Sequence, residues 1–243
     1  MVQHHDQYTT ADHETWEILF ERQVVNLQDK ACSDYLRCLG ALYPDLEGRE
    51  IPRFTRLDER LREATGWEIE VVPGLIPVGE FFDLMARRRF CSSTWVRTRA
   101  QLDYLEEPDM FHDIFGHVPL LMDPVFAGFM QRFGEIGQRF AGNVEAEAQL
   151  ERLYWFTIEF GLLMEEGRPK IFGAGILSSF GESKQIFEQP ITIHPFDIDR
   201  ILSHSFRKDV MQTEYYALES IAQLAESLDR VEVLLQALAP AVS

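Results

Sequence analysis

The sequence is poor in cysteine, in basic residues and in long hydrophobic runs. Only three of its 243 residues are cysteine, at positions Cys32, Cys38 and Cys91, and their spacing fits no metal-binding motif. Cys32 and Cys38 lie in a segment that we expect to be helical, on different sides of it, so we expect no disulfide between them. Reduced thiols are typical of a cytoplasmic protein, and we expect that location.

The shortage of basic residues limits the partners of the protein. Its 23 Lys and Arg against 40 Asp and Glu give a formal net charge of -17. Nucleic acids and anionic membranes select for Lys and Arg, so we expect neither as a partner. The N-terminal region has no basic stretch followed by an apolar one, and charged residues interrupt every long apolar segment. We therefore expect neither a signal peptide nor a membrane-spanning helix.

Apolar residues, by contrast, are abundant and make up 46% of the chain. Their spacing predicts helices from residue 12 onward and over residues 58–64, 79–89, 124–140, 145–166 and 214–238. Asp12 and Asp123 are expected to cap two of these helices. A short strand is expected at residues 69–72, followed by a loop at 73–77 that contains two prolines and a glycine.

Two further regions have less regular patterns. Residues 170–182 combine glycines and serines with apolar residues, which indicates a loop packed against a pocket. Residues 195–213 are expected to form short elements and turns, and residues 1–10 are polar and expected to be disordered. The predicted fold class is mainly α, with residues 11–243 forming a single compact helical catalytic domain with a few short strands.

The apolar segment 107–119 contains two histidines, His112 and His117. A single histidine in such a segment is usually just packed or hydrogen-bonded, whereas two close together favour a metal site. Five residues span about 140° around an α-helix, so a regular helix would not direct both rings to one point. We expect Gly116 and Pro119 to end the helix near His117, where irregular backbone can turn its ring toward His112.

Glu159 is the one carboxylate in the apolar segment 154–161. A glutamate normally lies on a solvated helix face, but Phe156 and Phe160 flank this one, and a buried glutamate needs a partner. Two histidines and one carboxylate are the ligand set of open non-haem Fe(II) sites, which leave positions for oxygen chemistry. Zinc is the alternative metal and would make the protein a helical hydrolase, with Asp113 as the only evident base.

Arg97 is a candidate for binding a substrate carboxylate, because a guanidinium can hold a carboxylate with two hydrogen bonds. The alternative is an ordinary ion pair with Asp109 or Asp103. Composition alone favours the ion pair.

Three blocks, residues 107–119, 154–161 and 173–182, resemble the catalytic domain of the pterin-dependent aromatic amino acid hydroxylases, and most of all the bacterial phenylalanine 4-hydroxylases. Weaker similarity extends from about Val72 to Tyr216. The resemblance implies a monooxygenase that uses Fe(II), a tetrahydropterin such as tetrahydrobiopterin, and O2 to hydroxylate L-phenylalanine to L-tyrosine. Tyrosine, tryptophan or another ring position is one alternative, and a non-catalytic metal-binding protein with the same fold is another.

The resemblance also implies roles for individual residues. His112, His117 and Glu159 would bind the iron, and Arg97, held by Asp109, would bind the carboxylate of the amino acid. The other residues of the amino acid pocket would be Pro108, Trp155, Phe160, Gly175 and Ser178. The pterin would contact Gly74, Leu75, Ile76, Asp113 and the ring of Phe81, with Tyr154 close to the iron.

Some positions depart from the pattern of the family. Asp113 stands where many members have Glu, and Val78 and Cys91 stand where animal members have Ser and His. Leu105 and Lys208 occupy positions connected with substrate choice, whereas Trp155 favours phenylalanine or tyrosine over tryptophan. The final apolar helix is expected to pack on its own domain, which predicts a monomer.

Overall fold

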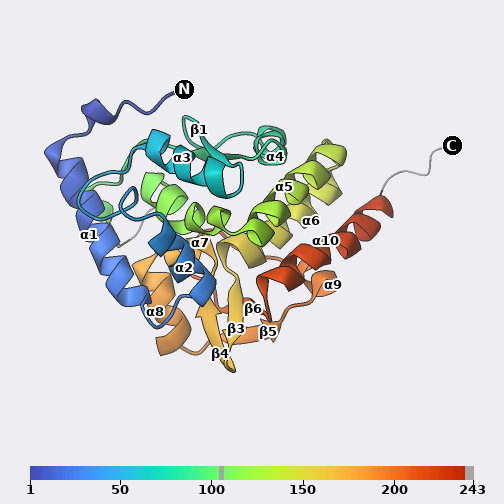
Figure 1. Ribbon diagram of the computed structural model, residues 1–243. Coiled ribbons are helices and arrows are strands. Elements are labelled where there is room, and N and C mark those ends of the chain that lie inside the picture. The colour runs from blue at the N-terminus through green and yellow to red at the C-terminus, as the bar shows by residue number, and fades with distance from the viewer. Residues whose placement is uncertain (104–106, 239–243) are drawn as a thin grey trace.

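The computed structural model describes residues 1–103 and 107–238, so Leu105 lies outside the described residues (Figure 1). Helices form most of the fold, as the sequence predicts. In Figure 1 the four-stranded sheet lies at the lower edge of the molecule, with α1 and α10 on opposite sides of the view. The helices are α1 (Thr10–Leu27), α2 (Ser33–Ala41), α3 (Phe54–Ala64), α4 (Val78–Ala86), α5 (Pro124–Arg139), α6 (Val144–Tyr154), α7 (Ala174–Leu177), α8 (Phe180–Glu188), α9 (Ile198–Ile201) and α10 (Ile221–Gln236).

Two side chains of the N-terminal segment make hydrogen bonds to distant parts of the chain. The Gln3 side chain donates a hydrogen bond to the Pro52 carbonyl (2.9 Å), and the Tyr8 hydroxyl donates to the Thr94 carbonyl (2.7 Å). Tyr8 suits this position, because its apolar body packs and its polar tip finds a partner. The disorder expected over residues 1–10 stays a prediction.

Two predicted helix caps have different outcomes. Thr9, and not Asp12, is the N-cap of α1: its hydroxyl accepts from the Asp12 backbone, while the Asp12 carboxylate accepts from the Thr9 backbone. Asp12 therefore closes a capping box from within the first turn. Asp123 caps α5 as predicted, because its carboxylate accepts from the backbone N–H groups of Val125 and Phe126.

The strands form two small sheets. β1 (Glu68–Val71) and β2 (Arg89–Ser92) pair in parallel. The second sheet has the order β4-β3-β6-β5 and is formed by β4 (Arg168–Ile171), β3 (Leu162–Glu165), β6 (Glu214–Leu218) and β5 (Thr192–Pro195). β3 runs antiparallel to β4 and parallel to β6, which is also parallel to β5.

Three predicted segments were wrong in their secondary structure. The predicted helix 145–166 ends before β3, and the predicted helix 214–238 begins with β6. Each strand contains a continuous apolar run, Leu162–Met164 in β3 and Tyr215–Leu218 in β6. Periodicity cannot distinguish a short buried strand from a buried helix. The predicted loop 170–182 contains the end of β4, all of α7 and the start of α8, although it does pack against the candidate site, as described below.

One continuous apolar core connects these elements. α5 crosses it, packing against α4 on one side and α10 on the other. The close approach of α4 depends on Gly134, where an added Cβ would lie 2.8 Å from the Met85 backbone. None of the helices in the described ranges is sufficiently long and apolar to cross a membrane.

The helix contact at Gly134 can be tested with two alanine substitutions in α5. Gly134→Ala should lower the melting temperature by about 3–10 °C, because overpacking costs about 1–3 kcal/mol in a domain of this size. Gly128→Ala is the matched control, since no atom lies within 4 Å of its added Cβ. Because alanine has a higher helix propensity than glycine, Gly128→Ala should leave the melting temperature unchanged or raise it. Calorimetry of both variants measures the difference, and equal melting temperatures would contradict the close contact.

Candidate metal centre

Two π-helices bring His112, His117 and Glu159 together. The first covers His112–His117 and the second Trp155–Glu159. The π-helical hydrogen bond joins residues i and i+5, so residues five apart lie above one another, unlike in an α-helix. This geometry explains how both histidines face one point. The π-helix ends at His117, as expected, but the irregular backbone that turns the rings toward each other is the π-helix itself. Gly116 serves packing instead, because an added Cβ would lie 2.9 Å from the Ala174 carbonyl oxygen.

The donor atoms of the three residues have the separations of a metal site. The two histidine Nε2 atoms are 3.2 Å apart, and Glu159 Oε1 lies 3.1 Å from His117 Nε2. The distance from Glu159 Oε2 to His112 Nε2 is 3.6 Å. Ligands about 2.1 Å from a metal and at right angles to one another stand about 3 Å apart. His112, His117 and Glu159 are also the one group of its kind in the described ranges whose ligand atoms all lie within 4.8 Å of one another.

The charge states also suit metal binding. Burial lowers the pKa of His112 to about 4, which leaves its imidazole neutral at pH 7. Burial opposes the ionisation of Glu159, but the two histidine rings outweigh it and lower the pKa of this carboxyl to about 2. A neutral imidazole and an ionised carboxylate are the forms that coordinate a metal.

Ser178 fixes the orientation of the His112 ring. The Ser178 hydroxyl donates to the Ala174 carbonyl (2.8 Å), and its oxygen lies 2.9 Å from His112 Nδ1. Because the hydroxyl hydrogen is already used, Nδ1–H of His112 donates to Ser178 and Nε2 keeps its lone pair toward the site. Ser178 was predicted to line the amino acid pocket, and the structure places it against a candidate metal ligand.

Arg97 and Asp109 form a buried ion pair next to the histidines. Asp109 Oδ2 accepts from Arg97 Nε (2.9 Å) and from the Arg97 backbone, and Oδ1 accepts from Arg97 Nη2 (2.8 Å). Oδ1 also accepts from the His112 backbone (3.1 Å), which ties the pair to the site. Arg97 Nη1 has no hydrogen-bond partner among residues 1–103 and 107–238, whereas Nε and Nη2 are both bonded to Asp109. Pro108 precedes Asp109 and is exposed.

Aromatic rings border the carboxylate side of the site. The ring centroids of Trp155 and Phe160 are 4.5 Å apart, and Phe206 stacks on Trp155 at 4.5 Å. Gly175 comes close to these groups, because an added Cβ would lie 3.0 Å from the Phe160 ring and 3.2 Å from Glu159 Oε2. The structure thus brings Trp155, Phe160 and Gly175 together at the metal donors.

The residues predicted to bind pterin are placed less uniformly. Phe81 on α4 contacts Tyr154 edge to face at 5.3 Å, and the Tyr154 ring stacks at 6.2 Å from that of His117. The Asp113 carboxylate accepts from the Ser93 backbone (2.9 Å), and burial raises its pKa to about 7. Gly74, Leu75 and Ile76 follow β1 in a loop, where Leu75 is 77% exposed, and no hydrogen bond among the described residues ties this loop to the metal donors.

Lys208 points away from the site. Its Nζ lies 2.6 Å from the Glu151 carboxylate, and 65% of its side chain is exposed. The charge of Lys208 is therefore paired on the surface of the protein.

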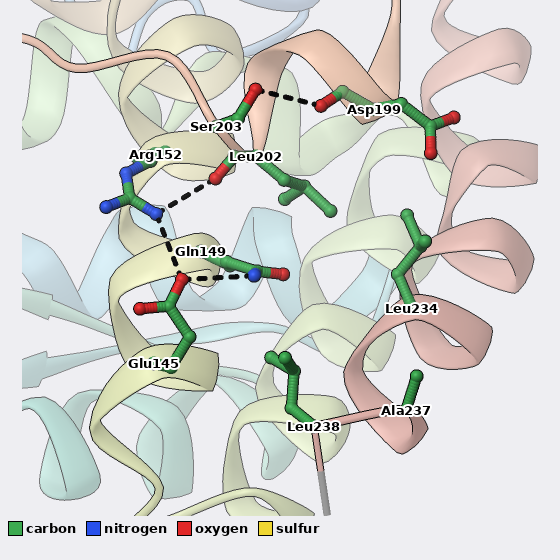
Figure 2. Close-up of a pocket in the computed structure, with 9 residues that line it drawn as sticks. All are labelled: Glu145, Gln149, Arg152, Asp199, Leu202, Ser203, Leu234, Ala237 and Leu238. Atoms are coloured by element: carbon green, nitrogen blue, oxygen red, sulfur yellow. Dashed lines mark hydrogen bonds and ion pairs between the residues drawn. The ribbon is translucent and has the colours of Figure 1, made fainter.

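A hollow of about 510 Å³ lies elsewhere, between α6, α9 and α10 (Figure 2). Leu202, Leu234 and Leu238 contribute to its lining. Arg152, which also lines the hollow, donates to the Leu202 carbonyl (2.9 Å) and pairs with Glu145 (3.5 Å). The guanidinium of Arg152 is therefore already bonded to other groups that line the hollow. It contains none of the predicted site residues.

Comparison with known proteins identifies the chain. The family model of the biopterin-dependent aromatic amino acid hydroxylases matches residues 4–237. The chain belongs to this family.

Individual hydroxylases are similar over most of their length. Phenylalanine-4-hydroxylase of Ralstonia nicotianae is 47% identical over 90% of this chain and 70% of its own length. The Caulobacter vibrioides enzyme of the same name is 46% identical over 90% and 74%. The structure of Chromobacterium violaceum phenylalanine hydroxylase with iron(III) and 7,8-dihydrobiopterin superimposes with a TM-score of 0.91 at 41% identity, covering 99% of this chain and 87% of the other. The predicted family and its mainly helical fold are confirmed.

Sequence reasoning missed several residues around this hydroxylase site. Phe206 and Gln212 hold Trp155, and the Ser93 backbone holds Asp113. Phe206 and Gln212 lie in a segment without periodicity, and Ser93 acts through its backbone, so neither pattern nor residue type marked them.

The Arg97–Asp109 pair can be tested with Asp109→Asn. This change leaves a buried guanidinium without its counter-charge, and it should destabilise the hydroxylase by about 3–5 kcal/mol. Asp103→Asn is the control, because Asp103 pairs with Arg22 while 82% of its side chain is exposed. It should change stability by less than about 1 kcal/mol. Urea unfolding measures both values, and similar small losses would show that the buried pair contributes little.

Proposed function

We propose that this protein is a phenylalanine 4-monooxygenase that converts L-phenylalanine to L-tyrosine with O2, Fe(II) and a tetrahydropterin. The observation that carries the proposal is the convergence of His112, His117 and Glu159 in a chain of this family. Structures of the related C. violaceum enzyme contain iron with oxidised cofactor, and iron with phenylalanine.

The donor set fits Fe(II). Two imidazoles and one carboxylate are the ligand set of open Fe(II) sites, so His112, His117 and Glu159 would hold the ion and leave positions for other ligands. Bound iron together with the reduced pterin supplies the activation of O2 that no amino acid side chain can provide. His112, held by Ser178, and Glu159, held beside Gly175, would keep the ligand positions fixed.

Arg97 would bind the carboxylate of the amino acid. Two of its nitrogens are held by Asp109, so the guanidinium is oriented before substrate arrives, and Nη1 remains for the ligand. The substrate ring would then lie against Trp155 and Phe160, in the aromatic surroundings of Glu159. Pro108, Gly175 and Ser178 would complete this pocket and help to exclude water.

The pterin would lie on the side of Phe81. Stacking on this ring and contacts with the loop of Gly74, Leu75 and Ile76 are supported by the position of Phe81 beside Tyr154. Tyr154 in turn contacts His117, which brings this side to the metal ligands. Asp113 would face the pterin with a carboxyl group that burial keeps partly protonated near pH 7.

We also propose that residues 11–243 form a single catalytic domain that acts as a cytoplasmic monomer. The continuous core supports one domain. Cys32, Cys38 and Cys91 are free thiols, and burial raises the pKa of Cys32 and Cys91 to about 12 and that of Cys38 to about 11. Such thiols react poorly and suit a reducing compartment. The acidic composition supports small molecules, and neither nucleic acid nor membrane, as partners.

The ligand assignment predicts the behaviour of His117→Ala. The variant keeps two of the three ligands of the proposed site, one histidine and one carboxylate. It should therefore bind much less than one Fe(II) per chain after anaerobic loading, and it should lose the tetrahydropterin-dependent conversion of L-phenylalanine. His4→Ala changes an exposed histidine outside the site and is the control. Metal analysis and product identification by NMR provide the measurement. Full iron content and activity in His117→Ala would show that His117 is not an iron ligand.

The substrate assignment predicts the behaviour of Arg97→Lys. Loss of the oriented guanidinium should raise the KM for L-phenylalanine about 10- to 100-fold, which corresponds to the free energy of one charge-assisted hydrogen bond. The KM for pterin should not change. Arg99→Lys is the control, because Arg99 forms an exposed pair with Glu14. Steady-state kinetics with phenylalanine, tyrosine and tryptophan measure the effect. An unchanged KM would show that Arg97 has only a structural role.

A further inference from the structure

Gln212 is a buried residue in which every polar side-chain atom has a partner. Its Oε1 accepts from the indole N–H of Trp155 (3.2 Å). Its Nε2 donates to the carbonyls of Arg207 (2.9 Å) and Val210 (2.8 Å). Only 8% of the residue is exposed. One planar amide therefore connects the indole of Trp155 to the backbone of the segment 205–211.

That segment has little structure of its own. Residues 205–211 lie between α9 and β6, and none of them forms a backbone–backbone hydrogen bond with another described residue. The two bonds from Gln212 therefore supply the order that a helix or strand would otherwise provide. Among the described residues, the other polar contact of this segment with a different element is the surface pair of Lys208 with Glu151. An exposed pair of this kind contributes little.

The same segment carries the ring that covers Trp155. Phe206 stacks on the indole with an interplanar angle of 18°. Trp155 also contacts Phe160, whose ring lies near Gly175 and the Glu159 carboxylate. The indole is therefore held by the Gln212 amide and by the Phe206 ring, and the Phe206 ring depends on the position of this segment.

Gln212 is itself held at its backbone by α8. Its N–H donates to the Glu182 carboxylate (3.3 Å), and its carbonyl accepts from the Gln185 side chain. The Tyr215 hydroxyl lies 2.9 Å from the same carbonyl. The amide therefore acts from a fixed position.

We propose that Gln212 is a positioning residue that sets the aromatic wall of the amino acid pocket, by fixing the Trp155 indole and the Phe206 ring at the same time. This inference rests on the proposed function, because it takes Trp155 as a wall of the substrate pocket. Gln212 does not touch the substrate, and its effect should appear in binding and selectivity.

Two variants separate the bonds of the amide. Gln212→Leu removes all three, whereas Gln212→Glu keeps an acceptor for the indole and replaces the two donors to the segment with an oxygen. Gln185→Leu is the matched control, because it removes one of three hydrogen bonds to the Gln212 backbone and keeps those of Glu182 and Tyr215. The bonds of the Gln212 side chain to the indole and to the segment are unchanged. Urea unfolding of each variant reports the general loss of stability.

The probes are L-phenylalanine and L-tryptophan, titrated calorimetrically into anaerobic Fe(II)-loaded enzyme. Gln212→Leu should raise the Kd of phenylalanine about tenfold, because the Trp155 indole and the Phe206 ring are no longer fixed. The ratio of the Kd of tryptophan to that of phenylalanine should become smaller. Gln212→Glu should weaken phenylalanine binding less. In turnover, both should form less tyrosine per tetrahydropterin oxidised, whereas Gln185→Leu should match the wild type in affinity, selectivity and coupling.

Unchanged affinity and selectivity in a folded Gln212 variant would overturn the inference, and so would an equal loss in Gln185→Leu, which would indicate general loosening. Wild-type enzyme that binds phenylalanine but does not hydroxylate it would refute the proposed reaction, while the binding data would still decide the role of Gln212. Wild-type enzyme that binds neither amino acid would overturn both.

Discussion

The packing of α7 against the two π-helices is the contact on which the site depends. The histidines and Glu159 lie on segments that are distant in sequence, so a third element must hold them in register. α7 does this at very short range: Gly116 meets Ala174, and Gly175 meets the Glu159 carboxylate. Such contacts leave no room for a Cβ, and Ser178 at the end of the helix orients the His112 ring. The short helix α7 therefore helps to position the three candidate ligands in two ways: Gly175 lets the Glu159 carboxylate approach closely, and Ser178 orients the His112 ring.

Sequence patterns predicted the parts of this arrangement that depend on local chemistry. The isolated Glu159 among aromatic residues and the close pair of histidines identified the donor set, because burial of such groups needs a compensating partner. The cap at Asp123 was predictable for the same reason, since a carboxylate satisfies unpaired N–H groups at a helix start. The π-helices were not predictable, because an extra residue in a turn costs local stability and tertiary contacts, among them those with α7, must compensate for it. β3 and β6 were missed because a buried run such as Tyr215–Leu218 has no period.

Charge is organised differently inside and outside the molecule. The large acidic excess belongs to the surface, whereas the interior of the site pairs its charges closely. Asp109 accepts hydrogen bonds from Arg97 and from the His112 backbone, so one carboxylate joins the candidate substrate anchor to a candidate metal ligand. Burying such a pair costs desolvation energy, and the pair is therefore weak evidence for stability. Its value lies in orientation: a guanidinium that is held on two nitrogens loses little further freedom when it binds a carboxylate.

The two sides of the site differ in how firmly they are built. On the histidine side, helices and a buried ion pair fix each group through several elements. On the Trp155 side, the segment carrying Phe206 has few bonds of its own and depends on one glutamine amide. Substitutions within that segment change side chains without breaking a helix or a strand, as the outward-facing Lys208 illustrates. A rigid metal side with an adaptable aromatic side allows amino acid selectivity to change while the geometry needed for oxygen chemistry is kept, because the two depend on different contacts.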